Sequence, residues 1–233
     1  MTDRHDTSAT LPWLRQGTDL LLSTVDKLDN AAFAEPSGLP GWSRAHLVGH
    51  VARNAEALVR LATWARTGVE APMYADRAQR AAEIEESAAF PPERLRAELH
   101  STAEDLDVAL AALAPQEWAA QVRSALGRAI PAAEVPWMRN REVWLHAVDL
   151  DTGVTTADLP AELVDLLLDD VTGMLSTKDG CPACTLRPTD RAGEWRLGAE
   201  PRLHTVTAPA AEVAGWLTGR AFLAGTPALP AWL

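Results

Sequence analysis

A glutamate and a histidine stand one helical turn apart in the segment VPWMRNREVWLHAVDLDTG, residues 135–153. Because Glu142 and His146 are separated by four positions, a helix would place both side chains on one face. The apolar residues around them predict that this face points into the core. A buried carboxylate is costly unless it is paired, hydrogen-bonded or bound to a metal. The pair therefore indicates a candidate metal site.

A third ligand for such a site must come from another helix, and His50 is the best candidate. It lies on the same side as the apolar stripe of the segment that follows Ser43. Zinc accepts imidazole and carboxylate ligands, and two histidines with one glutamate leave a coordination position open for chemistry. His46, one turn earlier, falls off that stripe and is expected at the surface. The other histidines are less suitable as ligands, since His5 lies in the N-terminal tail, His100 on a charged helix and His204 in a strand-like run.

Simpler structural roles for the same residues stay open at the level of sequence. Glu142 could pair with Arg139 or Arg141, and His146 could hydrogen-bond a backbone carbonyl. Asp149 could orient a ligand from outside the coordination sphere, or it could be an exposed residue at the helix end. An E-x-x-x-H pair alone is a weak signal for a metal.

The only cysteines, Cys181 and Cys184, form the sequence CPAC. A redox-active pair of this spacing usually opens a helix within a βαβ unit. Here the pair borders a strand-like run, CTLRP, and no second CxxC completes a zinc site. We expect reduced, semi-buried thiols without a catalytic role, and two cysteines exclude a disulfide scaffold.

The chain changes character after about residue 158. Apolar spacing first predicts helices over residues 11–28, 43–66, 75–89, 93–113 and 134–150, with an irregular stretch over 115–133. The later part predicts a helix over 160–175, short strands within 184–190, 193–198 and 202–209, and a last helix over 209–219. The fold class is therefore α plus α+β, with an all-helical domain over 1–157 and a small α+β domain over 158–233.

The formal net charge of -11 and a pI of about 5.0 exclude some classes of partner. An acidic surface repels phosphate backbones and anionic headgroups, so we expect neither a nucleic acid nor a membrane as partner. The first residues, MTDRHDTSATLPW, lack the apolar run of a signal peptide, and no segment approaches the ~20 apolar residues of a membrane span. A cytoplasmic protein is the expectation.

Three segments, in this order and spacing, resemble the mycothiol-dependent maleylpyruvate isomerases. They are GLPGWSRAHLVGHVARNAEAL, MYADRAQRAAEIEE and the segment VPWMRNREVWLHAVDLDTG, and the C-terminal AAEVAGWLTGR also resembles that family's second domain. The resemblance spans about residues 10–230. It implies a DinB-like four-helix bundle followed by a small α+β domain similar to sterol carrier proteins. Nineteen arginines against two lysines indicate a GC-rich genome, which agrees with an actinobacterial source.

The resemblance also implies roles for particular residues. His50, Glu142 and His146 match the zinc ligands of the family. Arg220, in the WLTGR run, matches an arginine that the second domain contributes to the active-site cleft. Candidates for contact with mycothiol lie in the MYADRAQR run: Met73, Tyr74 and Arg80. The CPAC pair has no counterpart in this pattern.

The reaction implied is the cis–trans isomerisation of maleylpyruvate to fumarylpyruvate in gentisate breakdown. A thiolate that adds across the double bond leaves a single bond that rotates, and elimination then returns the thiol and the trans alkene. Zinc could deprotonate the thiol or polarise the substrate ketone. Arg220 would bind a carboxylate of the dianionic substrate. Two alternatives stay open: another mycothiol-dependent, metal-containing thiol S-transferase, and a ligand-binding module without enzymatic activity.

Overall fold

The computed structural model of the protein describes residues 2–201 and 204–232. The chain divides into two compact units. One comprises Arg4–Thr152, and the other comprises Gly153–Leu233 together with Met1–Asp3. The predicted domain boundary between residues 157 and 158 stays a prediction. In the part of the chain that the structure describes, no helix is both long and apolar enough to cross a membrane.

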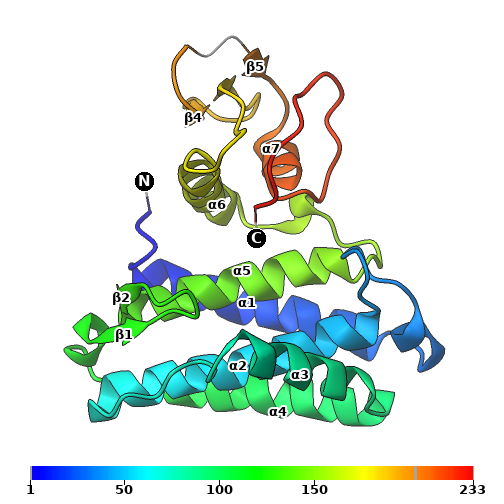
Figure 1. The fold of residues 1–233 in the computed structure, drawn as a ribbon, viewed down its shortest axis with the longest axis vertical. Coiled ribbons are helices and arrows are strands. Elements are labelled where there is room, and N and C mark those ends of the chain that lie inside the picture. Colours follow the sequence, from blue (N-terminus) through cyan, green and yellow to red (C-terminus); the bar gives the residue numbers. More distant parts are fainter. Residues whose placement is uncertain (1, 202–203, 233) are drawn as a thin grey trace. The chain divides into compact units, whose positions relative to one another are not determined.

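Four long helices run alongside one another in the Arg4–Thr152 unit (Figure 1). They are α1 (Thr7–Asp26), α2 (Arg44–Thr67), α4 (Pro92–Ala111) and α5 (Val135–Asp149). Helix α1 packs on α5 and α4 packs on α2, while α2 also contacts α5. The shorter α3 (Arg77–Ala88) lies against α2. Each of these helices was predicted from the apolar spacing, with ends displaced by a few residues, and the prediction is confirmed.

Local sequence explains where α2 begins and which face it buries. The Ser43 side chain accepts a hydrogen bond from the His46 backbone N–H, and His46 Nδ1 accepts one from the Ser43 backbone N–H. This is a capping box in which a histidine replaces the usual glutamate. The predicted apolar stripe of the helix is fully buried: Leu47, Val51, Leu58 and Leu61. The helix ends at Gly68, whose φ of 72° suits a residue without a β-carbon.

Helices α1 and α5 approach closely at Gly17. A β-carbon at this position would lie 2.5 Å from Trp144 Nε1, so only glycine admits the indole. The same indole donates a hydrogen bond to the Trp13 carbonyl at 3.1 Å.

Two hydrogen bonds hold the C-terminal end of α5. Gly38 N–H donates to the Asp149 carbonyl at 2.7 Å. Arg44 Nε donates to the Leu150 carbonyl, also at 2.7 Å, which ties the start of α2 to the end of α5.

The stretch over 115–133 was expected to be irregular, and that expectation is wrong. It contains a hairpin of two antiparallel strands, β1 (Gln121–Arg123) and β2 (Ala129–Pro131). Val122 and Ile130 lie opposite each other and are both buried. Each strand has only three residues, and no alternating pattern marks them in the sequence.

In the Gly153–Leu233 unit, two helices accompany a three-stranded sheet. The elements are α6 (Ala161–Leu175), β3 (Cys184–Leu186), β4 (Trp195–Leu197), β5 (His204–Val206) and α7 (Ala210–Leu217). Strand β3 is central, antiparallel to β4 and parallel to β5, and α6 packs against α7. The predicted elements are confirmed, although each strand has only three residues. Residues 202 and 203 of the last predicted strand lie outside the described residues.

The two cysteines of this unit are free thiols. Cys184 is fully buried in β3, and Cys181 is half-buried just before it. Burial raises the pKa of both thiols, which disfavours the reactive thiolate. Cys181 agrees with the expectation of a semi-buried thiol, whereas Cys184 is more buried than expected.

Candidate metal centre

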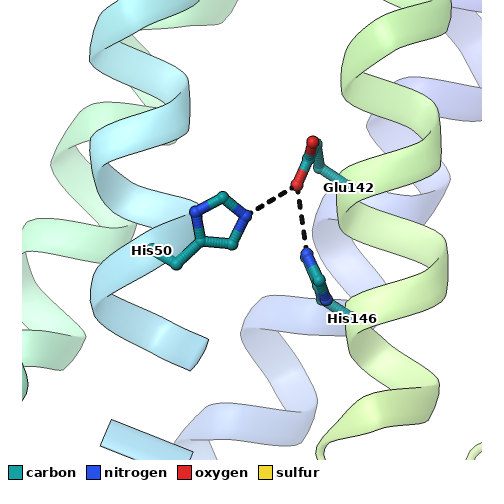
Figure 2. A group of neighbouring side chains, drawn as sticks. All are labelled: His50, Glu142 and His146. Carbon is teal, nitrogen blue, oxygen red and sulfur yellow. Dashed lines mark hydrogen bonds and ion pairs between the residues drawn. The ribbon is translucent and has the colours of Figure 1, made fainter. Parts of the chain in front are cut away.

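Three polar side chains converge between α2 and α5 (Figure 2). His50 projects from α2, while Glu142 and His146 project from α5. The Nε2 atoms of His50 and His146 lie 3.0 Å and 3.1 Å from the same carboxylate oxygen, Glu142 Oε2. One ligand atom from each residue lies within 4.8 Å of the other two. The structure thus brings together the three residues that the sequence offered as metal ligands.

The cluster is largely enclosed, with one accessible side. The exposed fractions of His50 and His146 are 3% and 9%, whereas the Glu142 side chain is 25% exposed. The two imidazole rings are nearly perpendicular, with centroids 5.0 Å apart. Each ring directs its Nε2 toward the carboxylate, and Glu142 is the most exposed of the three residues.

His146 makes a second hydrogen bond that orients its ring. Its Nδ1 donates to Asp149 Oδ2 at 2.8 Å, and Asp149 is only 3% exposed. A carboxylate on Nδ1 leaves Nε2 as the coordinating nitrogen, which is the usual outer-shell arrangement of a metal-binding histidine. Of the roles left open above, His146 therefore bonds a carboxylate rather than a backbone carbonyl, and Asp149 is buried rather than exposed.

His50 is held on two further sides. The ring of Trp42 packs on it edge-on, with centroids 5.3 Å apart. Arg80 Nη2 lies 3.4 Å from His50 Nδ1. Arg80 and Arg60 both lie 6.0 Å from the ring centroid of Tyr74. Of the candidate contact residues, Arg80 therefore lies close to His50, and Tyr74 lies close to Arg80.

The electrostatics of the cluster favour an ionised carboxylate. Burial alone would raise the pKa of Glu142, but the hydrogen bonds and charges of the two histidines hold it well below its ordinary value. Burial lowers the pKa of His50 more than Glu142 raises it. For His146 burial also acts downward, but the hydrogen bonds to Asp149 and Glu142 outweigh it and raise the pKa.

This donor set fits a divalent metal ion. Ligand atoms around a tetrahedral zinc lie about 3.4 Å apart, given bond lengths of about 2.0–2.2 Å. The two nitrogen-to-oxygen separations of 3.0 Å and 3.1 Å need only a small expansion to admit an ion. Three protein ligands would leave a coordination position for another molecule. Together, His50, Glu142 and His146 could hold a metal ion.

Arg139 has a different role from the one considered in the sequence. Instead of pairing with Glu142, its Nη1 donates to the Val51 carbonyl at 2.7 Å and to Asn54 Oδ1 at 2.9 Å. Its exposed fraction is 1%, and burial lowers its pKa to about 10. The structure gives it no carboxylate partner among the described residues. A buried positive charge therefore lies one turn from Glu142, a feature that the sequence did not reveal.

His46 was expected at the surface, and this is wrong in part. Its ring is half-buried, stacked on Trp42 with centroids 6.5 Å apart, and its Nδ1 completes the capping box described above. Its Nε2 lies 3.4 Å from Glu85. The capping geometry turns the ring away from the ligand cluster, so His46 is excluded as a rival of His50.

Arg220 lies directly after α7 in the Gly153–Leu233 unit. Its backbone N–H bonds the Gly215 carbonyl at 2.7 Å, and its Nη1 donates to the Thr218 carbonyl at 2.8 Å. These hydrogen bonds close the C-terminal end of α7. The expected contribution of Arg220 to the active-site cleft stays a prediction.

The chain joins a helical unit to a small α+β unit. The helical unit carries a cluster of two histidines and one glutamate that could hold a metal ion, so the class is that of two-unit proteins with a candidate metal centre. Residues 14–151 match the family model described as the mycothiol maleylpyruvate isomerase N-terminal domain. The chain is also similar to a solved structure, the crystal structure of the mycothiol-dependent maleylpyruvate isomerase. Identity is 33% over 100% of both chains, with a TM-score of 0.94.

A second solved structure is the same isomerase with one histidine replaced by alanine. It is 32% identical over 100% of both chains, with a TM-score of 0.94. No curated protein matches. The family model covers more than half of the chain and the structural similarity covers all of it, so this chain belongs to the mycothiol maleylpyruvate isomerase family.

Proposed function

We propose that the protein catalyses the mycothiol-dependent cis–trans isomerisation of maleylpyruvate to fumarylpyruvate. The observation that carries this proposal is the convergence of His50, Glu142 and His146 in a chain of this family. The chain is similar over its full length to a mycothiol-dependent maleylpyruvate isomerase, and a site with three ligands leaves room for a further molecule.

Zinc is the metal that we propose for the site. His50 Nε2, His146 Nε2 and Glu142 Oε2 would hold it, since these atoms converge and suit its preferences. When bound, zinc supplies a Lewis acid and mycothiol supplies a nucleophile that makes the double bond transiently single, so that it can rotate. Asp149 orients the His146 ring whether or not a metal is bound, because its hydrogen bond is to Nδ1 and not to the metal-facing nitrogen.

Several residues of the chain are proposed to bind the two reactants. Tyr74 and Arg80 border His50 and are proposed to contact mycothiol. Arg220 is proposed to bind a carboxylate of the dianionic substrate, because a guanidinium can hold a carboxylate through two parallel hydrogen bonds. Buried Arg139 adds a positive charge near the ligand cluster, which favours anions on an otherwise acidic protein.

We also propose a more specific architecture for each of the two domains. The four packed helices support a DinB-like four-helix bundle over residues 1–157. The small sheet with two helices supports an α+β domain similar to sterol carrier proteins over residues 158–233. We further propose a cytoplasmic enzyme of gentisate catabolism in an actinobacterium.

The test is turnover of maleylpyruvate by the purified chain with mycothiol present at far lower concentration than substrate. Many turnovers per mycothiol would support the isomerase, because the thiol is regenerated in each cycle. Stoichiometric consumption of mycothiol with formation of a stable conjugate would instead identify another mycothiol-dependent S-transferase. No reaction by metal-loaded protein would contradict both.

A further inference from the structure

Arg80 is a half-buried cation beside the ligand cluster without a carboxylate partner among the described residues. It lies 3.4 Å from His50 Nδ1 and 6.0 Å from the ring centroid of Tyr74, and it also forms a hydrogen bond with the neutral Tyr74 side chain. The first distance is long for a hydrogen bond, and the second contact involves no anion. Most of the hydrogen-bonding capacity of this guanidinium is therefore uncommitted.

A second arginine near the tyrosine makes different contacts. Arg60 lies at the same 6.0 Å from the Tyr74 centroid, but its Nε and Nη2 both donate to the Met73 carbonyl. It fixes the backbone that carries the tyrosine. Arg80 has no such backbone acceptor, so the two arginines have different roles.

The carboxylates near Arg80 are already committed elsewhere. Glu142, in the ligand cluster, accepts from both histidines, while Asp76 and Glu83, one turn either side of Arg80 in the sequence, both accept from Gln79. A partly buried cation without a counter-ion carries a desolvation cost that an incoming anion would offset. Arginine suits this purpose because its planar fork matches a carboxylate.

We propose that Arg80 binds one carboxylate of the dianionic substrate and thereby contributes to its selection. This assignment rests on the proposed function and, for Arg80, replaces contact with mycothiol by contact with the substrate. The thiol cofactor brings at most one negative charge, at its sulfur, whereas maleylpyruvate brings two carboxylates. Two carboxylates call for two cations, and Arg80 is the one that the helical unit places next to His50.

A double-mutant cycle between protein and ligand tests the proposal without turnover. The probe is the saturated analogue of maleylpyruvate, which has no double bond to isomerise. Two further probes each have one carboxylate replaced by a neutral carboxamide. Binding of all three is measured by calorimetry to metal-loaded wild type, Arg80→Met, Arg80→Lys and Arg77→Met. Arg77 is the matched control because it lies on the same helix and is exposed.

For wild type and Arg77→Met, replacing one particular carboxylate should weaken binding about 10- to 100-fold, as for loss of a charge-assisted hydrogen bond. For Arg80→Met the same replacement should change binding less than about threefold, with Arg80→Lys intermediate. The metal content of Arg80→Met should equal that of wild type.

Additive effects of Arg80→Met with both carboxylate replacements would overturn the proposal. Loss of metal from Arg80→Met would also overturn it, since Arg80 would then act by supporting His50. Because the probes cannot react, coupling between Arg80 and one carboxylate would support the assignment even if the chain failed to isomerise maleylpyruvate. Failure of the proposed function is therefore distinguishable from failure of this inference.

Discussion

Asp149 Oδ2 accepts a hydrogen bond from His146 Nδ1 at 2.8 Å, within a single helix and out of contact with solvent. The two residues are three positions apart on α5, so the helix itself sets their geometry. The bond fixes the ring so that Nε2 faces Glu142 Oε2. Asp149 thus prepares a ligand for a metal that it does not itself contact.

Replacing Asp149 by asparagine should weaken zinc binding about tenfold or more, because outer-shell partners of metal-bound histidines contribute about that much. The amide keeps the shape of the side chain but removes the negative charge. Competition with a chromophoric chelator measures the affinity. Asp151→Asn is the control, since Asp151 is exposed and its φ of 53° is one that asparagine adopts readily. Equal affinities for both variants would contradict the assigned role of Asp149.

Removing one of the ligands should abolish stoichiometric metal binding. We expect His50→Ala to retain less than about one tenth of the wild-type zinc after dialysis, because two remaining ligands hold zinc poorly. Elemental analysis of the purified variants provides the measurement. His100→Ala serves as a control, because His100 is exposed on α4 and bonds Asp26. Full metal occupancy in His50→Ala would remove His50 from the ligand set.

Arg139→Met should lower the free energy of unfolding by about 1–3 kcal/mol, because buried Asn54 loses its donor. The Val51 carbonyl suffers less, since it also lies within helix α2. Adding Asn54→Leu to this variant should recover most of the loss, because the orphaned acceptor is then removed. Urea denaturation of both variants measures the effect. A double variant less stable than Arg139→Met alone would argue against an orphaned amide as the cause.

Glu134 should make the protein more stable at neutral than at acidic pH. Burial alone would raise its pKa, but the hydrogen bonds from Arg128 and His5 outweigh it and lower the pKa below 4.5. A depressed pKa in the folded state means that the stabilisation is present above the unfolded value. It is lost as the pH falls through the folded pKa. Glu134→Gln should therefore be less stable than wild type at pH 7.

The same variant should approach wild-type stability at an acidic pH below the folded pKa of Glu134, because the carboxyl is then protonated in both the folded and the unfolded chain. Urea denaturation at both pH values gives the two differences. A difference in stability that is the same at both pH values would show that the charge of Glu134 is not its source.

Part of the candidate site could be predicted because helical periodicity is a local property. The spacing of Glu142 and His146 specified a common face, and the stripe around His50 specified the inner face of α2. The contact between those two faces depends on tertiary packing, so the sequence offered His50 only as the best candidate for a third ligand, and the resemblance to a family supported that choice. The structure supplied the distances between their atoms.

Other features could not be predicted, for physical reasons that differ. Whether Asp149 is exposed depends on the Gly38 loop that covers the end of α5, and this loop is distant in sequence. Arg139 is buried because Asn54 and the Val51 carbonyl accept from it across the helix interface. An arginine side chain is usually exposed, so the residue type alone favoured an exposed position for Arg139. The hairpin of β1 and β2 was missed because its three-residue strands carry no periodic signal, whereas the equally short β3 to β5 lie in longer strand-like runs that glycine and proline residues separate.

The most direct test of a metal-dependent isomerase is the initial rate of maleylpyruvate isomerisation with a small amount of mycothiol, before and after removal of metal. We expect many turnovers per mycothiol. This activity should be lost when elemental analysis shows the metal to be gone, and it should return when one equivalent of zinc is added. Undiminished turnover by the metal-free chain would contradict the metal centre. Absence of turnover by the zinc-loaded chain would contradict the isomerase.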